Sequence, residues 1–148
     1  MNKNNLPFIM IVGKMMHEYF KVLKKRTGDQ SDIILTIEQF GLLHALNQKD
    51  EDVIQKDMAE VMCKDKSAIL RLIDTLEEKE LVRRVVNLND RRKNFLMVAK
   101  KGEKVIAQYL KIEKELTLEV KKGLTEEELA TFYKVVSHIK EKASYLNT

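Results

Sequence analysis

The chain has 148 residues, of which 44% are hydrophobic and 34% charged, a composition typical of one domain or a compact two-lobed unit with its own core. Its only cysteine, Cys63, excludes an intrachain disulfide and is typical of a reducing compartment. The apolar start of the chain is short and lacks a cleavage site, and no apolar run reaches the roughly 20 residues of a membrane span. We therefore expect a cytoplasmic protein without a membrane segment.

Apolar residues recur every three or four positions over residues 8–26, which predicts a first helix that ends before Gly28. Thr36 and Gln39 have the spacing of a capping box, in which each side chain bonds the backbone N–H of the other residue. They predict a second helix that extends to about Asn47 and buries Phe40, Leu43 and Leu46.

Val53 and Ile54 suggest a short strand, followed by a short helix over residues 55–62. The next helix, over residues 66–80, has Asp65 as its expected N-cap. Its apolar face repeats with helical spacing and consists of Ile69, Leu72, Ile73 and Leu76. The opposite face carries Ser67, Leu70, Arg71 and Asp74.

Two β-prone runs, residues 81–86 and 95–99, follow this helix and flank a charged turn. Residues 81–104 contain eight cations and two carboxylates, a local charge of +6, whereas the whole chain carries only +4. The expected hairpin tip contains Asp90, Arg91, Arg92 and Lys93. Cations on such a tip suit the narrow minor groove of DNA, where the negative potential is strongest. The alternative is an ordinary basic turn in which Asp90 is a local turn former.

The helices expected over residues 55–62 and 66–80 are joined by a turn short enough for a helix-turn-helix, which would present the second helix to a major groove. An ordinary helical hairpin with a solvated polar face is the alternative. A basic hairpin directly after the helix pair favours DNA binding over an ordinary helical hairpin and an ordinary basic turn. The residues expected to contact DNA are Lys56 at the backbone, Lys64, Lys66, Ser67, Ala68, Leu70 and Arg71 on the second helix, and Asp90, Arg91, Arg92 and Lys93 on the hairpin.

The C-terminal third is predicted to form two helices. The first, over residues 100–122, ends at Gly123 and aligns Val105, Tyr109, Ile112, Leu116 and Val120 on one side. The second begins at another capping box, Thr125 and Glu128, and its apolar stripe contains Leu129, Phe132, Val136, Ile139 and Ala143. Because the first and last helices both carry apolar stripes while the central part is small, we favour a homodimer that intertwines them over a monomer that folds them together.

From about residue 36 to residue 102 the sequence resembles the MarR family of bacterial transcription regulators, and the helical flanks extend this likeness to nearly the whole chain. The order and spacing of several stretches carry the resemblance: residues 57–60, 67–77, 81–84 and 90–93, with Gly102 at the expected distance. The resemblance implies a single domain, residues 1–148, that is mainly α with a small β-hairpin wing. Its parts would be a helical dimerisation lobe (about 1–30 and 100–148) and a winged helix-turn-helix (about 36–99), with a recognition helix (66–80) and a wing (87–94).

Three positions depart from the family pattern. The glycine that usually separates the recognition helix from the following strand is Glu80 here. The usual Leu-Thr before the next helix is Val98-Ala99, which removes a hydroxyl N-cap. The turn of the helix-turn-helix carries Cys63-Lys64. These departures affect helix ends rather than the residues expected to contact DNA.

Some relatives sense oxidants through a cysteine, typically in the first helix, which contains none here. Cys63 lies near a helix start beside lysines, which favours a reactive thiolate, but a role as a small, half-buried apolar residue is better supported.

The three histidines lack metal-ligand spacing, so we expect no metal and no cofactor. A cleft for a small aromatic effector, as such proteins have between their two lobes, would be lined by Met16, His17, Phe20 and His44.

The sequence thus predicts a sequence-specific DNA-binding regulator, a ligand-responsive repressor that binds a palindromic operator as a homodimer. Two alternatives are a winged-helix module whose basic hairpin binds an acidic protein, and a regulator that senses oxidants through Cys63. An enzyme is not expected because the sequence has no nucleophile–base set, no glycine-rich phosphate loop and no metal-binding cluster.

Overall fold

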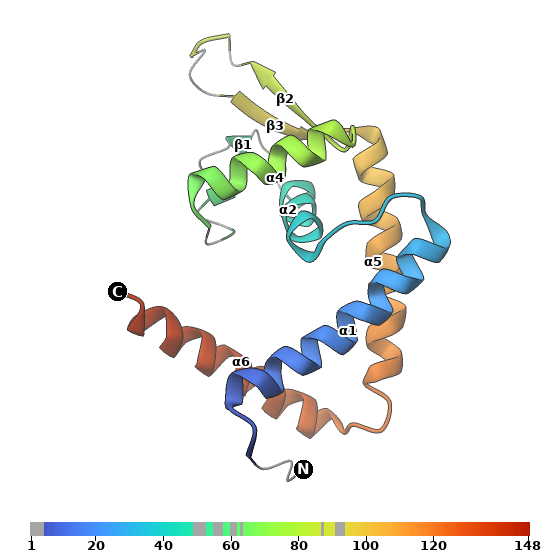
Figure 1. Ribbon diagram of the computed structural model, residues 1–148, viewed down its shortest axis with the longest axis vertical. Coiled ribbons are helices and arrows are strands. Elements are labelled where there is room, and N and C mark those ends of the chain that lie inside the picture. The colour runs from blue at the N-terminus through green and yellow to red at the C-terminus, as the bar shows by residue number, and fades with distance from the viewer. Residues whose placement is uncertain are drawn as a thin grey trace. The chain divides into compact units, whose positions relative to one another are not determined.

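The structure is a computed structural model that describes residues 5–48, 53–54, 58–59, 62, 64–86, 88–90 and 94–148. It contains, in chain order, α1 (Phe8–Gln30), α2 (Ile37–Asn47), β1 (Val53–Ile54), α4 (Lys66–Glu78), β2 (Val82–Val86), β3 (Asn94–Val98), α5 (Lys100–Val120) and α6 (Glu126–Leu146) (Figure 1). The predicted fold, mainly α with a small β-hairpin, is confirmed. The chain divides into two compact units, Met1–Lys114 and Glu115–Thr148, and the division lies inside α5.

The first helix is longer than the sequence predicts, because α1 continues through Gly28 to Gln30. Leu23 and Thr27 are buried near its end, and Thr27 Oγ1 donates a hydrogen bond of 2.9 Å to the carbonyl of Leu23. A glycine inside a helix costs only about 1 kcal/mol relative to alanine, so the packing of this buried side outweighs it. The helix ends where Ser31 adopts an extended conformation.

The predicted helix starts are confirmed by their caps. Thr36 Oγ1 accepts from the backbone N–H of Gln39 at 3.2 Å, and the N–H of Thr36 donates to Gln39 Oε1 at 3.0 Å. Thr125 and Glu128 form the same reciprocal pair before α6, at 3.1 and 3.0 Å. Each box satisfies two backbone N–H groups that no helical carbonyl can reach. Helices α4 and α5 each end two residues earlier than expected.

Strands β2 and β3 form the expected antiparallel hairpin, and β1 pairs with the other edge of β3, so the sheet order is β1-β3-β2. Arg84 lies opposite Leu96, and Arg83 lies opposite Met97. Val82 and Leu96 are buried, whereas Arg83 and Met97 are exposed, as the alternation of a strand with one covered face requires. The hairpin projects away from α2 and α4 (Figure 1).

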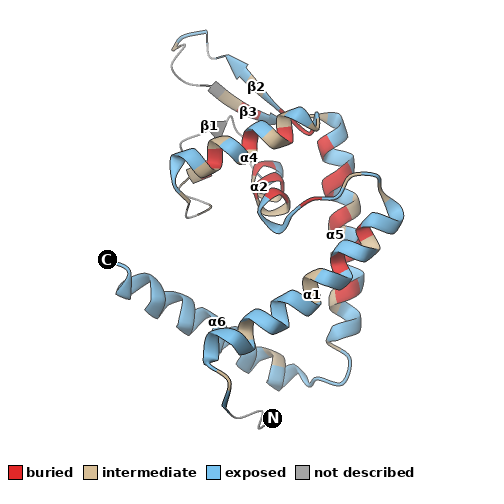
Figure 2. Ribbon diagram, in the orientation of Figure 1, coloured by how far each residue is buried: buried red, intermediate tan, exposed pale blue. Residues whose placement is uncertain are grey.

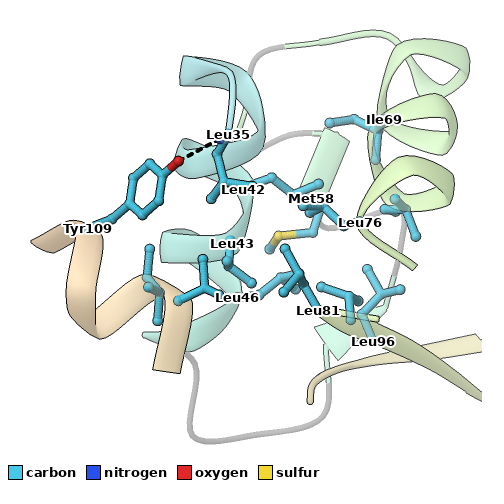
Figure 3. Close-up of a cluster of buried hydrophobic side chains, with 14 residues drawn as sticks. Leu35, Leu42, Leu43, Leu46, Met58, Ile69, Leu76, Leu81, Leu96 and Tyr109 are labelled. Carbon is cyan, nitrogen blue, oxygen red and sulfur yellow. Dashed lines mark hydrogen bonds between the residues drawn. The ribbon is translucent and has the colours of Figure 1, made fainter. Parts of the chain in front are cut away.

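The core of the first unit lies between α2, α4, the sheet and α5 (Figures 2 and 3). Its fully buried side chains include Leu42, Leu43, Met58, Ile69, Ile73, Leu76, Leu81 and Ile106. The buried face predicted for α4 is confirmed, except that Leu72 is half-buried, as is Phe40 of α2. Of the five apolar residues predicted on one side of α5, four are buried, whereas Val120, the last residue of the helix, is 51% exposed. Within α6, all of which is described, no residue is buried (Figure 2).

Helix α4, strand β2 and helix α5 meet at Leu81. The chain leaves α4 through Glu80, whose φ of +61° lies in the left-handed region, and the N–H of Leu81 donates to the carbonyl of Leu76 at 2.9 Å. This is a Schellman helix end with glutamate in the position that glycine usually takes. The carbonyl of Leu81 accepts from the N–H of Ala99 at 2.9 Å. A Cβ on Gly102 would overlap this carbonyl oxygen, so only glycine fits there.

We predict that Glu80→Gly raises the free energy of unfolding by about 0.5–1 kcal/mol. A side chain in the left-handed region costs about 1–2 kcal/mol, and the greater freedom of glycine in the unfolded chain offsets about 0.4–1 kcal/mol of the gain. Glu80→Ala is the control, because it removes the exposed ion pair with Lys101 (3.6 Å) but retains Cβ. Urea unfolding should rank the glycine variant above the alanine variant. Equal stabilities would show that the backbone at this position is not strained.

Candidate nucleic-acid interface

The N-terminal half of α4 presents a polar, basic surface, which we call the α4 surface. Its members are the predicted DNA-contacting residues of this helix: Lys66, Ser67 and Arg71, which are exposed, and Ala68 and Leu70, which are half-buried. Ser67, Leu70 and Arg71 follow helical spacing on the side opposite the buried isoleucines. The structure therefore brings these residues together on one element. Whether they contact DNA stays a prediction.

The start of α4 is fixed by its N-cap. Asp65 Oδ1 accepts from the backbone N–H of Ala68 at 2.7 Å, which confirms Asp65 as the cap. Such a cap is worth about 0.5–2 kcal/mol, and its negative charge is favourable at the positive end of the helix dipole. Ile69 and Ile73 anchor the same turns in the core. The α4 surface is thus held by a cap at one end and by packing on the opposite side.

Lys64, which precedes α4, is paired with a carboxylate. Its Nζ lies 2.8 Å from Glu38 Oε1 in the first turn of α2, and the two side chains are 29% and 53% exposed. An ion pair this exposed contributes at most about 1 kcal/mol to stability. It nevertheless places a negative charge beside a cation that the sequence predicts to contact DNA. Nothing in the sequence pattern indicated this partner, which lies 26 positions away.

Arg84 on β2 is bound to two carboxylates of α4, a cluster that the sequence interpretation missed. Its Nη2 lies 2.5 Å from Asp74 Oδ1, and its Nη1 lies 2.8 Å from Glu77 Oε1. The backbone N–H of Arg84 also donates to Glu77 Oε2 at 3.2 Å. Burial of the guanidinium disfavours its charge, but Asp74 and Glu77 outweigh that effect and raise the pKa of Arg84. In the sequence, the three-residue spacing of Asp74 and Glu77 on one helix could have indicated this cluster.

The predicted hairpin tip is described only in part. Asp90 is half-buried, and β2 and β3 lead up to the tip. The other predicted residues lie outside the described part of the chain: Arg91, Arg92 and Lys93 of the wing, Lys56 and Cys63. Their roles in DNA binding or oxidant sensing therefore stay predictions.

The residues predicted to line an effector cleft are not seen around one hollow. His17 lines a shallow hollow that is formed by α1 alone, together with Met10, Gly13, Lys14 and Glu18. Met16 is exposed and Phe20 half-buried one turn further along the same helix. His44 of α2 stacks on Phe40 with ring centroids 6.3 Å apart. Among the described residues, its buried Nδ1 has no hydrogen-bond partner. The effector site stays a prediction.

Within the described residues, no group of three or more histidine, cysteine, aspartate or glutamate side chains is placed to hold a metal ion. In that same part of the chain, no helix combines the length and apolar character needed to span a membrane.

A hairpin that follows a capped, amphipathic helix on a helical core defines the winged-helix class, and comparison with known proteins agrees. Residues 35–93 match the model of the MarR family. The S. aureus MepR–DNA complex has a TM-score of 0.82 at 21% identity, covering 93% of this chain and 99% of that one. Wild-type E. coli MarR in its apo form has a TM-score of 0.67 at 21% identity, covering 90% and 97%.

A third similar structure is a MarR-family transcriptional regulator from Rhodococcus sp. RHA1, with a TM-score of 0.69 at 21% identity and 88% of each chain covered. Residues 35–93 are thus similar to the MarR family, and the likeness to the solved structures shows the same fold over most of the chain.

Proposed function

We propose that this protein is a DNA-binding transcriptional regulator that binds a palindromic operator as a homodimer. The observation that carries the proposal is the α4 surface, with Lys66, Ser67 and Arg71 exposed on a helix that a cap and a buried face hold in place. Its place in a MarR-like winged helix and the likeness to MepR, solved as a DNA complex, support it. A regulator of this kind would act in the cytoplasm.

In this proposal α4 enters the major groove while the β2–β3 hairpin reaches the adjacent minor groove. Lys66 and Arg71 would donate to phosphates or to guanine, and Ser67 to phosphates or base edges. Arg92 at the hairpin tip would enter the minor groove, where the negative potential is strongest. A helix supplies base-edge contacts and the basic hairpin supplies affinity, so the pair gives both specificity and strength.

Exposed apolar side chains support a dimer. Phe132, Val136 and Ile139 form a stripe on α6, and each is between 39% and 45% exposed. On α1, the exposed apolar residues are Phe8, Ile9, Met10, Ile11, Met15 and Met16. A homodimer would cover these exposed apolar side chains, because obligate homodimers bury large and mainly apolar interfaces. A symmetric dimer would place two copies of α4 about 34 Å apart, one turn of DNA, which matches a palindromic operator.

The proposal also includes a response to a small ligand. A small aromatic effector that binds better to a dimer with the wrong separation of its two α4 helices would weaken operator binding by a population shift, which is how a repressor is released. Titration of an operator complex with phenolic and other aromatic acids tests this. Unchanged operator affinity across the set would leave DNA binding standing and remove the aromatic effector.

Lys66→Ala and Arg71→Ala should each weaken binding to an operator selected from a random DNA pool. Each should also reduce the slope of log affinity against log salt by about one for every phosphate that the variant no longer neutralises. Lys111→Ala is the matched control, because it removes an exposed cation from α5, outside the winged helix. Fluorescence anisotropy titrations at several salt concentrations measure both quantities. Slopes equal to that of the control would mean that the α4 surface does not touch phosphates.

Arg92→Ala should weaken operator binding by about tenfold or more while leaving thermal unfolding unchanged, because a tip residue contributes to the minor groove and not to the core. Gel-shift titration gives the affinity. An unchanged affinity would remove the wing from the interface. A wild-type protein that prefers no duplex over another would instead favour the protein-interaction module.

Val136→Asp should convert the dimer to a monomer and abolish operator binding, because a buried carboxylate in an apolar interface is costly. Its neighbour Ser137→Asp is the matched control, since it adds the same charge beside the stripe. Sedimentation equilibrium gives the oligomeric state. A dimeric Val136→Asp variant would show that this stripe is not the interface.

A further inference from the structure

The contacts of Arg84 join two elements that the proposed function uses separately. Its guanidinium bonds Asp74 and Glu77 near the C-terminal end of α4, while its own backbone belongs to β2, at the base of the hairpin. Strand β2 is an edge strand, and Glu77 accepts from the backbone N–H of Arg84 as well as from its side chain. Planar guanidinium groups hold carboxylates in a defined geometry that lysine does not provide. The cluster is therefore a directional brace between α4 and the hairpin.

By electrostatics alone, Asp74 and Glu77 would weaken DNA binding. Asp74 lies on the same side of α4 as Ser67 and Arg71, at positions i, i+4 and i+7, so in the proposed complex it faces a polyanion. Asp74 and Glu77 are 57% and 42% exposed, whereas Arg84 is 22% exposed. Two carboxylates near phosphates weaken non-specific binding. The two carboxylates must therefore contribute something to operator binding that exceeds their repulsion of the phosphates.

We propose that Arg84 is a positioning residue: through Asp74 and Glu77 it sets the angle between α4 and the β2–β3 hairpin, so that both reach their grooves together. This inference rests on the proposed function. Between Glu78 at the end of α4 and Val82 at the start of β2 there are three residues, and Glu80 holds its left-handed conformation without glycine. The brace spans this short turn from outside. It fixes how the hairpin leaves the helix.

The test depends on the sign of an effect. In the double variant Asp74→Ala/Glu77→Ala, two negative charges disappear from the DNA-facing side, so simple electrostatics predicts tighter binding to every duplex. Positioning predicts that affinity for the selected operator falls by about tenfold or more, while affinity for a random duplex stays the same or rises. Glu78→Ala is the matched control, because it removes an exposed carboxylate from the same helix. Operator affinity that rises in parallel with random-duplex affinity would overturn the proposal.

Arg84→Ala added to the double variant separates positioning from direct DNA contact. If Arg84 acts through the two carboxylates, the triple variant should bind the operator no more than about twofold more weakly than the double variant, with the same salt slope. A further drop in affinity together with a slope reduced by about one would assign Arg84 a phosphate contact and overturn the proposal.

Hydrogen exchange gives a readout that does not need DNA. The double variant should exchange the backbone amides of residues 82–86 at least several-fold faster than wild type, while the amides of Ile69 and Ile73 in the core keep their protection. Unchanged exchange in β2 would show that the brace does not hold the hairpin, whatever the protein binds. Failure of the proposed function has a different signature, because the wild-type protein itself would then show no preference among duplexes.

Discussion

The two hydrogen bonds of the Leu81 peptide groups set the geometry of the winged helix. The side chain of Leu81 is fully buried, so its N–H and carbonyl must find partners inside the protein. The N–H bonds the end of α4 through Leu76, and the carbonyl bonds Ala99 at the start of α5, with Gly102 packed against it. Helix α4, the start of β2 and the start of α5 are therefore held together at Leu81.

A second connection runs through the segment between α1 and α2. The hydroxyl of Tyr109 accepts from the N–H of Leu35 at 2.6 Å (Figure 3). The same hydroxyl donates to the carbonyl of Ile33 at 2.9 Å. Lys79, directly after α4, donates to the carbonyl of Ile34 at 3.1 Å. Helix α5 and the end of α4 thus hold the same short segment. These contacts give the proposed ligand response a physical connection between α5 and the end of α4.

Some cations of residues 81–104 are paired with carboxylates that the sequence alone does not place beside them. The count of +6 over residues 81–104 treats every cation as available to a partner. In the structure Arg84 is occupied by Asp74 and Glu77, and Lys101 lies 3.6 Å from Glu80. Helical spacing places residues 74 and 77 on neighbouring positions, but the turn at Glu80 decides which strand residue faces them. Among the described residues of this segment, Arg83, Lys100 and Lys104 remain exposed, and Lys66 and Arg71 of the α4 surface are exposed as well.

The sequence by itself determined the features that depend on neighbours in the chain. The capping boxes at Thr36 and Thr125, the Asp65 cap, the buried face of α4 and the hairpin follow from local hydrogen bonding and periodicity. The tertiary structure decided the continuation of α1 past Gly28, the exposure of Val120 and the partners of Arg84. These depend on packing and charges from elements distant in the chain, whose positions no local pattern specifies.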